Sequence, residues 1–182
     1  MWIISLGKRS EFERVERDYY PTPMEAVLPL LPHLKKYSNF YEPCAGDGRL
    51  IDHLDYHNHT CIEAWDIEPQ EKWILQSNAL DIQFNPVYYG WNIDYIITNP
   101  PWDRKILHPM IEHFSNQLPT WLLFDADWMH TKQSSALMKR CEMVVSVGRV
   151  KWIEGSKTSG KDNCAWYLFT NTTNAKTVFY GR

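Results

Sequence analysis

The chain of 182 residues has an apolar fraction of 44% and a formal net charge of −3. This length fits one domain, and the apolar content is sufficient to bury a sizeable core. The small net charge excludes a global basic field, so a nucleic-acid partner would have to be held by a local patch. The four cysteines form no Cys-x-x-Cys pair, which argues against a zinc ribbon or a disulfide framework.

The chain shows no targeting or membrane segment. The apolar start, residues 1–6, is too short for a signal peptide, and no run is long enough to span a membrane. We therefore expect a soluble cytoplasmic protein without a membrane partner. Residues 5–18 are strongly charged and predict a mobile arm or an exposed helix. Because no repeat or linker follows, we expect a single domain over residues 1–182.

The predicted elements alternate between short apolar runs and amphipathic segments. The predicted helices cover residues 23–36, 48–56, 104–118 and 132–141. The predicted strands cover residues 39–42, 60–66, 73–76, 95–98 and 121–124, followed by a hairpin of 144–153 with 165–169. Residues 177–180 could add an edge strand. This alternation implies a parallel sheet with helices on both faces. We therefore predict an α/β fold, one doubly wound Rossmann-like domain with a mostly parallel seven-stranded sheet and a C-terminal antiparallel hairpin.

A glycine-containing turn follows the first predicted strand. Gly46 and Gly48 allow the chain to turn tightly and to approach a ligand closely. The next strand ends at Asp66, where an acid can accept hydrogen bonds from ribose hydroxyls. Leu50 and Ile51 occupy the place of the third glycine of a dinucleotide fingerprint, which favours a nucleoside cofactor without a pyrophosphate. An ordinary turn and a solvated acid are the alternatives.

A polar pair follows the third predicted strand. The side chain of Asn78 and the backbone at Ala79 could contact an adenine edge. A turn capped by Asn or Asp accounts for the same residues equally well.

The most informative tetrapeptide is Asn99-Pro100-Pro101-Trp102, at the end of the fourth predicted strand. Ligands of open α/β sheets bind outside the carboxyl ends of the strands. The two prolines fix the backbone, so that the Asn99 side chain and the Pro100 carbonyl face the crevice as acceptors. Two acceptors that hold the hydrogens of an amine favour a pyramidal, nucleophilic nitrogen. Trp102 offers a flat face for a planar substrate, although a turn with a core Trp is the alternative.

These motifs resemble a known family. The order Glu-Pro-x-x-Gly-x-Gly from Glu42, the strand-end Asp66 and the Asn-Pro-Pro-aromatic turn at Asn99 are similar to class I methyltransferases that modify planar amino groups. More narrowly, they resemble adenine-N6 DNA methyltransferases, including small ones of phages and mobile elements. Residues 18–23 resemble the upstream motif of that family.

The resemblance implies a cofactor, S-adenosylmethionine, and a set of residues that bind it. The implied cofactor residues are Tyr20, Pro21, Thr22, Glu42, Pro43, Cys44, Ala45, Gly46, Asp47, Gly48, Asp66, Ile67, Asn78, Ala79 and Asn99. The implied catalytic residues are Asn99, Pro100, Pro101 and Trp102. The family usually has an apolar residue at Cys44 and Tyr or Phe at Trp102, so the base preference of this chain is open.

The substrate side is less defined. No insertion between Gly46 and Asn99 provides a target-recognition region, so we expect relaxed specificity, or specificity from a dimer mate or partner. The candidate DNA phosphate contacts are Arg104, Lys105, Arg149, Lys151, Lys157 and Lys161, with Trp128, Trp152 and Trp166 interleaved. Each of these charges could instead serve solubility.

Three alternatives remain open for the function. The same site could methylate an RNA adenine or a protein glutamine amide, or the chain could be a regulatory subunit that binds S-adenosylmethionine without turnover. His53 and His57 have a spacing that can bind a metal, but on a surface helix we expect no metal site.

Overall fold

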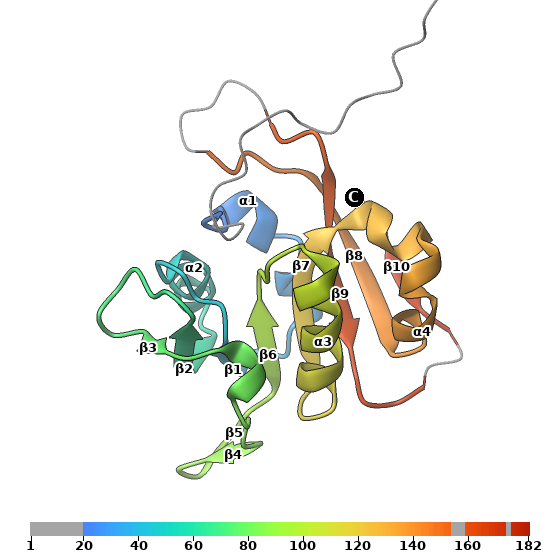
Figure 1. Ribbon diagram of the computed structural model, residues 1–182. Helices are drawn as coiled ribbons and strands as arrows, with labels where there is room; N and C mark the ends of the chain where they lie inside the picture. Colours follow the sequence, from blue (N-terminus) through green and yellow to red (C-terminus); the bar gives the residue numbers. More distant parts are fainter. Residues whose placement is uncertain (1–19, 154–158, 174–175) are drawn as a thin grey trace, which may run out of the picture.

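The computed structural model describes residues 20–153, 159–173 and 176–182 (Figure 1). The strands of its main sheet are β1 (Asn39–Glu42), β2 (Thr60–Asp66), β3 (Leu75–Gln76), β6 (Tyr95–Thr98), β7 (Thr120–Asp125), β8 (Cys141–Arg149), β9 (Asn163–Phe169) and β10 (Val178–Tyr180). They lie in the order β10-β8-β9-β7-β6-β1-β2-β3. Only β9 runs antiparallel to its neighbours, β7 and β8.

The predicted α/β class, the mostly parallel sheet and the C-terminal antiparallel hairpin are therefore confirmed. The number of strands differs from the prediction. The sheet has eight strands rather than seven, because β10 pairs in parallel with β8 and extends the edge.

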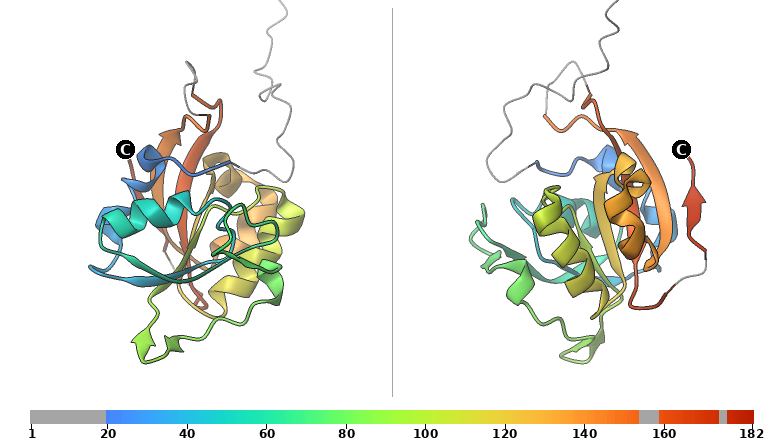
Figure 2. Two further views of the ribbon diagram at one scale, coloured as in Figure 1. Left: turned by 90° about the vertical axis from the view of Figure 1, so that its left-hand side faces the viewer. Right: turned by 45° about the vertical axis from the view of Figure 1, so that its right-hand side comes forward.

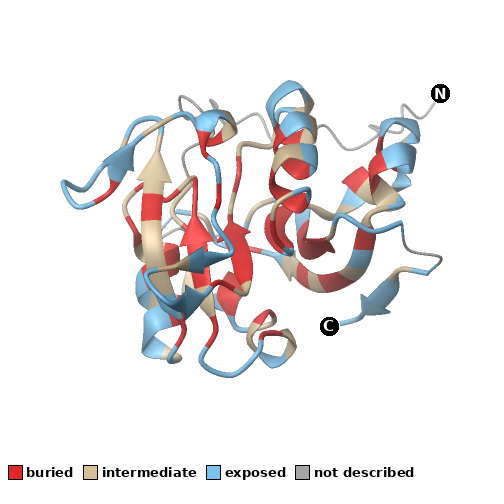
Figure 3. Ribbon diagram, turned by 90° about the horizontal axis from the view of Figure 1, so that it is seen from below, coloured by how far each residue is buried: buried red, intermediate tan, exposed pale blue. Residues whose placement is uncertain are grey.

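Helices cover both faces of this sheet (Figure 2). One face carries α1 (Met24–Val27) and α2 (Arg49–Tyr56), and the other carries α3 (Arg104–Ser115) and α4 (Ser135–Met138). Side chains of a strand alternate between faces. Accordingly, Trp121 and Leu123 of β7 pack in the cluster with α1 and α2, whereas Leu122 and Phe124 pack in the cluster with α3. The buried residues concentrate along these central strands (Figure 3).

Prolines shorten the first predicted helix. Instead of one helix over residues 23–36, the chain forms α1 and the 3₁₀ turn η2 (Leu31–His33). Pro29 and Pro32 lack the backbone N–H that an α-helix requires, and their rings clash with the preceding turn. The prediction of a continuous helix was therefore wrong.

The second departure lies between β7 and β8. The helix predicted over residues 132–141 consists of η5 (Lys132–Ser134) and α4, and it follows η4 (Ala126–His130). Cys141 already belongs to β8, which ends at Arg149 rather than at residue 153. A pairing irregularity at Ser146/Gly148, with Gly148 at a φ of 85°, precedes the end of β8.

Besides η4, one turn and one hairpin were not predicted. The turn η3 (Ala79–Asp81) follows β3, and a small hairpin is formed by β4 (Val87–Tyr88) and β5 (Trp91–Asn92). Its two turn residues, Tyr89 and Gly90, have φ values of 45° and 87°. Positive φ at both positions is what a two-residue hairpin turn of type I′ requires. The hairpin projects from the edge of the molecule where β6 begins (Figure 1).

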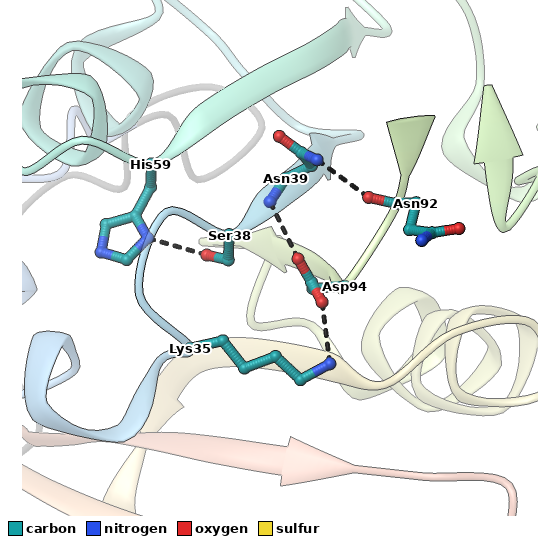
Figure 4. Close-up of polar contacts among 6 residues, drawn as sticks. All are labelled: Lys35, Ser38, Asn39, His59, Asn92 and Asp94. Carbon is teal, nitrogen blue, oxygen red and sulfur yellow. Dashed lines mark hydrogen bonds and ion pairs between the residues drawn. The ribbon is translucent and has the colours of Figure 1, made fainter. Parts of the chain in front are cut away.

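Polar contacts tie the starts of β1 and β6 together (Figure 4). The Asp94 carboxylate accepts hydrogen bonds from Lys35 Nζ at 2.8 Å and from Asn39 N at 3.1 Å. Asn39 Nδ2 donates to the Asn92 carbonyl at 2.9 Å. A buried contact of 2.7 Å joins Ser38 Oγ and His59 Nδ1.

Within the described ranges, no helix combines the length and the apolar character that crossing a membrane requires.

The aromatic stack between β7 and β9 predicts a large stability effect. The Phe124 ring lies 4.2 Å from that of Tyr167 and 5.1 Å from that of Trp128, measured between centroids. We expect Phe124→Ala to lower the free energy of unfolding by about 3–5 kcal/mol, because it leaves a cavity in a close-packed core. The matched control, Tyr89→Ala, removes a ring that is 88% exposed and should change it by less than about 0.5 kcal/mol. Urea unfolding measures both; similar losses would contradict this account of the core.

Candidate active site

A cavity of about 690 Å³ lies at the carboxyl ends of β1, β2, β3 and β6. Its walls come from the turns that follow these strands, from residues 20–22 and from the first half of α3. This is the edge at which open α/β sheets bind ligands, and sites for small molecules typically enclose roughly 300–1,000 Å³. The position of the cavity therefore suits a small-molecule ligand.

Most of the residues predicted for the site line this cavity. They are Tyr20, Pro21, Thr22, Pro43, Cys44, Ala45, Gly46, Asp47, Asp66, Ile67, Asn78, Ala79, Asn99, Pro101 and Lys105. Four others, Glu42, Gly48, Pro100 and Trp102, lie outside the lining. Glu42, Gly48 and Pro100 are buried, and Trp102 is half-buried between the two core clusters.

The glycine turn is held by the end of β2. Asp66 Oδ2 accepts a hydrogen bond of 2.8 Å from Gly46 N, and Asp66 Oδ1 accepts one of 2.7 Å from Glu68 N. Gly46 has a φ of 56°, in the left-handed region that favours glycine. A carboxylate has about four acceptor positions, so Asp66 can accept further hydrogen bonds from a ligand.

Gly48 is the second residue of this turn with a left-handed backbone conformation. It precedes α2 with a φ of 83°, and a Cβ atom there would lie 2.5 Å from Cζ2 of Trp73. The indole of Trp73 thus covers the start of α2. Both the backbone angle and the available space favour glycine at this position.

The Asn99 amide is held in one orientation. Its Nδ2 donates to the Tyr20 carbonyl and to Thr22 Oγ1, each at 3.2 Å. Both amide hydrogens are then used, and this network assigns the Oδ1 atom as the acceptor end. Trp102 Nε1 donates to Oδ1 over a long 3.4 Å, which leaves acceptor capacity on that oxygen.

Three aromatic rings gather beside Asn99. The rings of Trp102 and Trp152 meet edge to face with centroids 5.9 Å apart, and Tyr20 lies 6.2 Å from Trp152. Trp152 follows β8, far from the other two in the sequence. The fold therefore brings three aromatic side chains together at the carboxyl ends of the strands.

The cavity is acidic. Among the described residues, its charged lining consists of Asp47, Asp66, Glu68 and Asp103 against the cation Lys105. Glu42, beneath this wall, is fully buried, and burial raises the pKa of its carboxyl group to about 8. Burial also raises the pKa of the Cys44 thiol well above its usual range. Such surroundings favour a cationic ligand.

The predicted basic residues are spread over two segments. Lys105 lines the cavity at the start of α3, and Arg104 beside it contacts Gln133 at 3.5 Å. Arg149, Lys151 and Lys161 are exposed near the facing ends of β8 and β9. Lys157 lies outside the described residues. Of the other tryptophans considered, Trp128 and Trp166 are core residues.

Sequence reasoning missed several residues of the lining. They are Leu50, Glu68, Gln70, Leu80, Asp103, Ile106 and Met110. Asp103 could have been found, because it caps α3 by accepting from Lys105 N at 2.9 Å, and Asp is a common N-cap. Leu50 and Met110 belong to apolar helix faces whose periodicity predicts burial but not contact with a cavity.

Comparisons with known proteins relate the chain to other proteins through its fold. No family model matches it, and no curated protein sequence does. The solved structures that share its fold include the following three. A type I restriction-modification methyltransferase subunit from Streptococcus thermophilus has a TM-score of 0.56 at 12% identity, covering 88% of this chain and 46% of that one. The 23S rRNA methyltransferase ErmE has a TM-score of 0.55 at 9% identity, and the match covers 87% of this chain and 72% of that one.

The third is a candidate class I S-adenosylmethionine-dependent methyltransferase from Listeria monocytogenes, with a TM-score of 0.51 at 9% identity, covering 85% of this chain. This chain spans 61% of the Listeria protein and about half of the Streptococcus subunit. Identities this low establish the fold alone. The chain has the Rossmann-like fold of class I methyltransferases.

The Gly48–Trp73 contact predicts a difference between two glycine substitutions. Gly48→Ala and Gly90→Ala both place Ala at a positive φ, but the added Cβ has no atom within 4 Å at Gly90. We expect Gly48→Ala to lower the free energy of unfolding by about 1–3 kcal/mol more than Gly90→Ala, through overpacking. Trp73→Ala in the Gly48→Ala background should remove this excess. Urea unfolding of the wild type and these three variants measures it, and equal losses at both glycines would show that the indole moves aside at no cost.

Proposed function

We propose that this protein is an S-adenosylmethionine-dependent methyltransferase that modifies the exocyclic amine of adenine in DNA. The observation that carries this proposal is the fixed Asn99 amide. Its two hydrogens are used by Tyr20 and Thr22, so its oxygen is available as an acceptor at the cavity wall.

The cavity fits the proposed cofactor. S-adenosylmethionine supplies a methyl group on a positively charged sulfonium. In the described part of the chain, four acidic side chains against one lysine give the cavity the opposite charge. Glu42 Oε2 beneath it is buried without a partner among the same residues. Asp66 would accept hydrogen bonds from the ribose, and Asn78 with Ala79 would contact the adenine. The glycine turn, Pro43 to Gly48, and residues 20–22 would hold the methionine end.

Asn99 and Pro100 would prepare the acceptor amine. The lone pair of an exocyclic nitrogen is delocalised into its ring, so the free amine is a poor nucleophile. Asn99 Oδ1 and the Pro100 carbonyl would each accept one amine hydrogen and favour a pyramidal nitrogen. Catalysis would then come from positioning and electrostatics, with no strong base required.

The aromatic cluster supports a planar acceptor. Trp102 and Trp152 meet beside Asn99 and offer ring surface for a base. A base inside a duplex cannot reach the cavity, so DNA would have to present it flipped or single-stranded. Lys105, Arg149, Lys151 and Lys161 are exposed candidates for phosphate contacts at this edge.

The choice of adenine in DNA rests on the resemblance of the motifs, and sequence specificity would be relaxed or supplied by a second copy or a partner. The fold is shared by a restriction-modification methyltransferase subunit and by an rRNA methyltransferase. RNA and protein acceptors are therefore included in the test.

The test is transfer of labelled methyl from S-adenosylmethionine to unmodified DNA, RNA and protein. We expect the label as N6-methyladenine in DNA. Asn99→Ala should lower the rate about 10²–10³-fold, the loss typical of removing one positioned hydrogen-bonding group, while cofactor affinity changes much less. Asn171→Ala, at an exposed site in the segment after β9, is the matched control and should retain the rate.

Each outcome has a distinct meaning. Label found only in RNA or protein would overturn the DNA acceptor and retain the methyltransferase. Cofactor binding without transfer to any acceptor would favour a regulatory protein. An Asn99→Ala variant with full activity would remove Asn99 from the mechanism.

A further inference from the structure

The carboxyl group of Glu42 is buried with almost no hydrogen bonding. Its side chain is 0% exposed at the end of β1. Oε1 accepts one long hydrogen bond of 3.3 Å from Cys44 N, and Oε2 has no partner among the described residues. The Thr98 hydroxyl is close enough to favour the ionised form, but it makes no hydrogen bond of good geometry. A carboxylate in such a place would be strongly destabilised, so the neutral acid is preferred.

Among the described residues, no cation offsets this burial. The charged group that acts on Glu42 is Asp66 on β2, and the thiols of Cys44 and Cys61 lie close enough for the charge of Glu42 to raise their pKa. Burial is the main cause that raises the pKa of Glu42 to about 8; the Cys44 amide opposes the rise, and the negative charge of Asp66 adds to it. Without a ligand, Glu42 therefore retains its proton at neutral pH.

The position of Glu42 relates it to the cavity. The five residues that follow it, 43–47, all line the cavity, as does Asp66. Glu42 thus lies one layer behind the wall, in surroundings of low polarity where charges interact over longer distances than in water. A positive charge in the cavity would stabilise the ionised carboxylate.

We propose that Glu42 loses its proton when a cationic cofactor enters the cavity, so that cofactor binding is coupled to proton release. This inference rests on the proposed function. The O–H bond of the Glu42 carboxyl group breaks, the proton goes to the solvent buffer, and the carboxylate that remains is stabilised by the positive charge of the ligand. Glu42 is then a positioning residue that makes cofactor affinity depend on pH.

The test is calorimetric titration of the protein with S-adenosylmethionine, in two buffers of different ionisation enthalpy, between pH 6 and 9. We expect release of about one proton per bound cofactor at pH 7 and almost none at pH 9. The association constant should rise by up to about tenfold per pH unit and level off above pH 8. Glu42→Gln, which mimics the neutral acid, should abolish both effects; thermal unfolding checks that it folds. Any proton exchange that remains in the Glu42→Gln variant comes from the cofactor's own amine and is subtracted from the wild-type value.

Two further arms strengthen the experiment. S-adenosylhomocysteine lacks the sulfonium charge, so proton release with both ligands assigns the effect to the ammonium group, and release with S-adenosylmethionine alone assigns it to the sulfonium. Either result supports the proposal. When S-adenosylmethionine binds, the infrared difference spectrum of the wild type should lose a protonated carboxyl band, and that of Glu42→Gln should not.

The outcomes separate this inference from the proposed function. Binding of S-adenosylmethionine with no proton release and no loss of the carboxyl band would overturn the role of Glu42 and leave the methyltransferase proposal standing. Absence of binding at any pH would overturn the proposed function itself.

The same group predicts how the stability of the free protein depends on pH. The pKa of Glu42 is raised from 4.5 to about 8 on folding. Its contribution to the free energy of unfolding is therefore fully present below the unfolded pKa and is lost as the pH rises through about 8. We expect the melting temperature of the wild type to fall more steeply from pH 5 to pH 8 than that of Glu42→Gln. Parallel slopes would show that Glu42 does not titrate in this range.

Discussion

The Asp66 carboxylate holds the two turns on which the cavity depends. It binds the amide of Gly46 in the turn after β1 and the amide of Glu68 in the turn after β2. Hydrogen bonds to a charged acceptor are stronger than neutral ones. The bond to Gly46 joins residues that are twenty positions apart in the sequence. These two backbone N–H groups at the edge of the sheet are thereby paired, and the two turns are fixed to each other through one carboxylate.

The opposite wall is organised in the same way, by one polar side chain that joins distant segments. Asn99, at the end of β6, binds the backbone of Tyr20 and the hydroxyl of Thr22 across almost eighty residues. The contact orients the amide and also closes the cavity with residues 20–22. The same contact therefore orients the Asn99 side chain and encloses the ligand. Such preorganisation is what catalysis by positioning requires.

The elements predicted best from the sequence are those in which the apolar pattern and the residues that end the element indicate the same boundaries. The β1–α2–β2 unit and the strand before Asn99 were predicted nearly to the residue. For β1 and β6 the reason is that a buried run ends just before a proline, Pro43 or Pro100. Pro29 and Pro32 could have warned against the helix over residues 23–36. The β4–β5 hairpin was missed because Tyr89 occupies a turn position that Asn or Gly usually signals. That Glu42 Oε2 has no partner among the described residues could not be predicted at all, since it depends on what β2 and β6 place beside it.

The unpaired polar atoms of the core are not distributed evenly. Within the described part of the chain, the buried side-chain atoms without a hydrogen-bond partner are Glu42 Oε2, Thr98 Oγ1, His53 Nε2 and Trp121 Nε1. The first two lie at the carboxyl ends of adjacent strands, β1 and β6, beneath the cavity wall. Unpaired polar groups are tolerated where a ligand can offset their burial. The two at β1 and β6 lie where a cation bound in the cavity would stabilise the ionised form of Glu42.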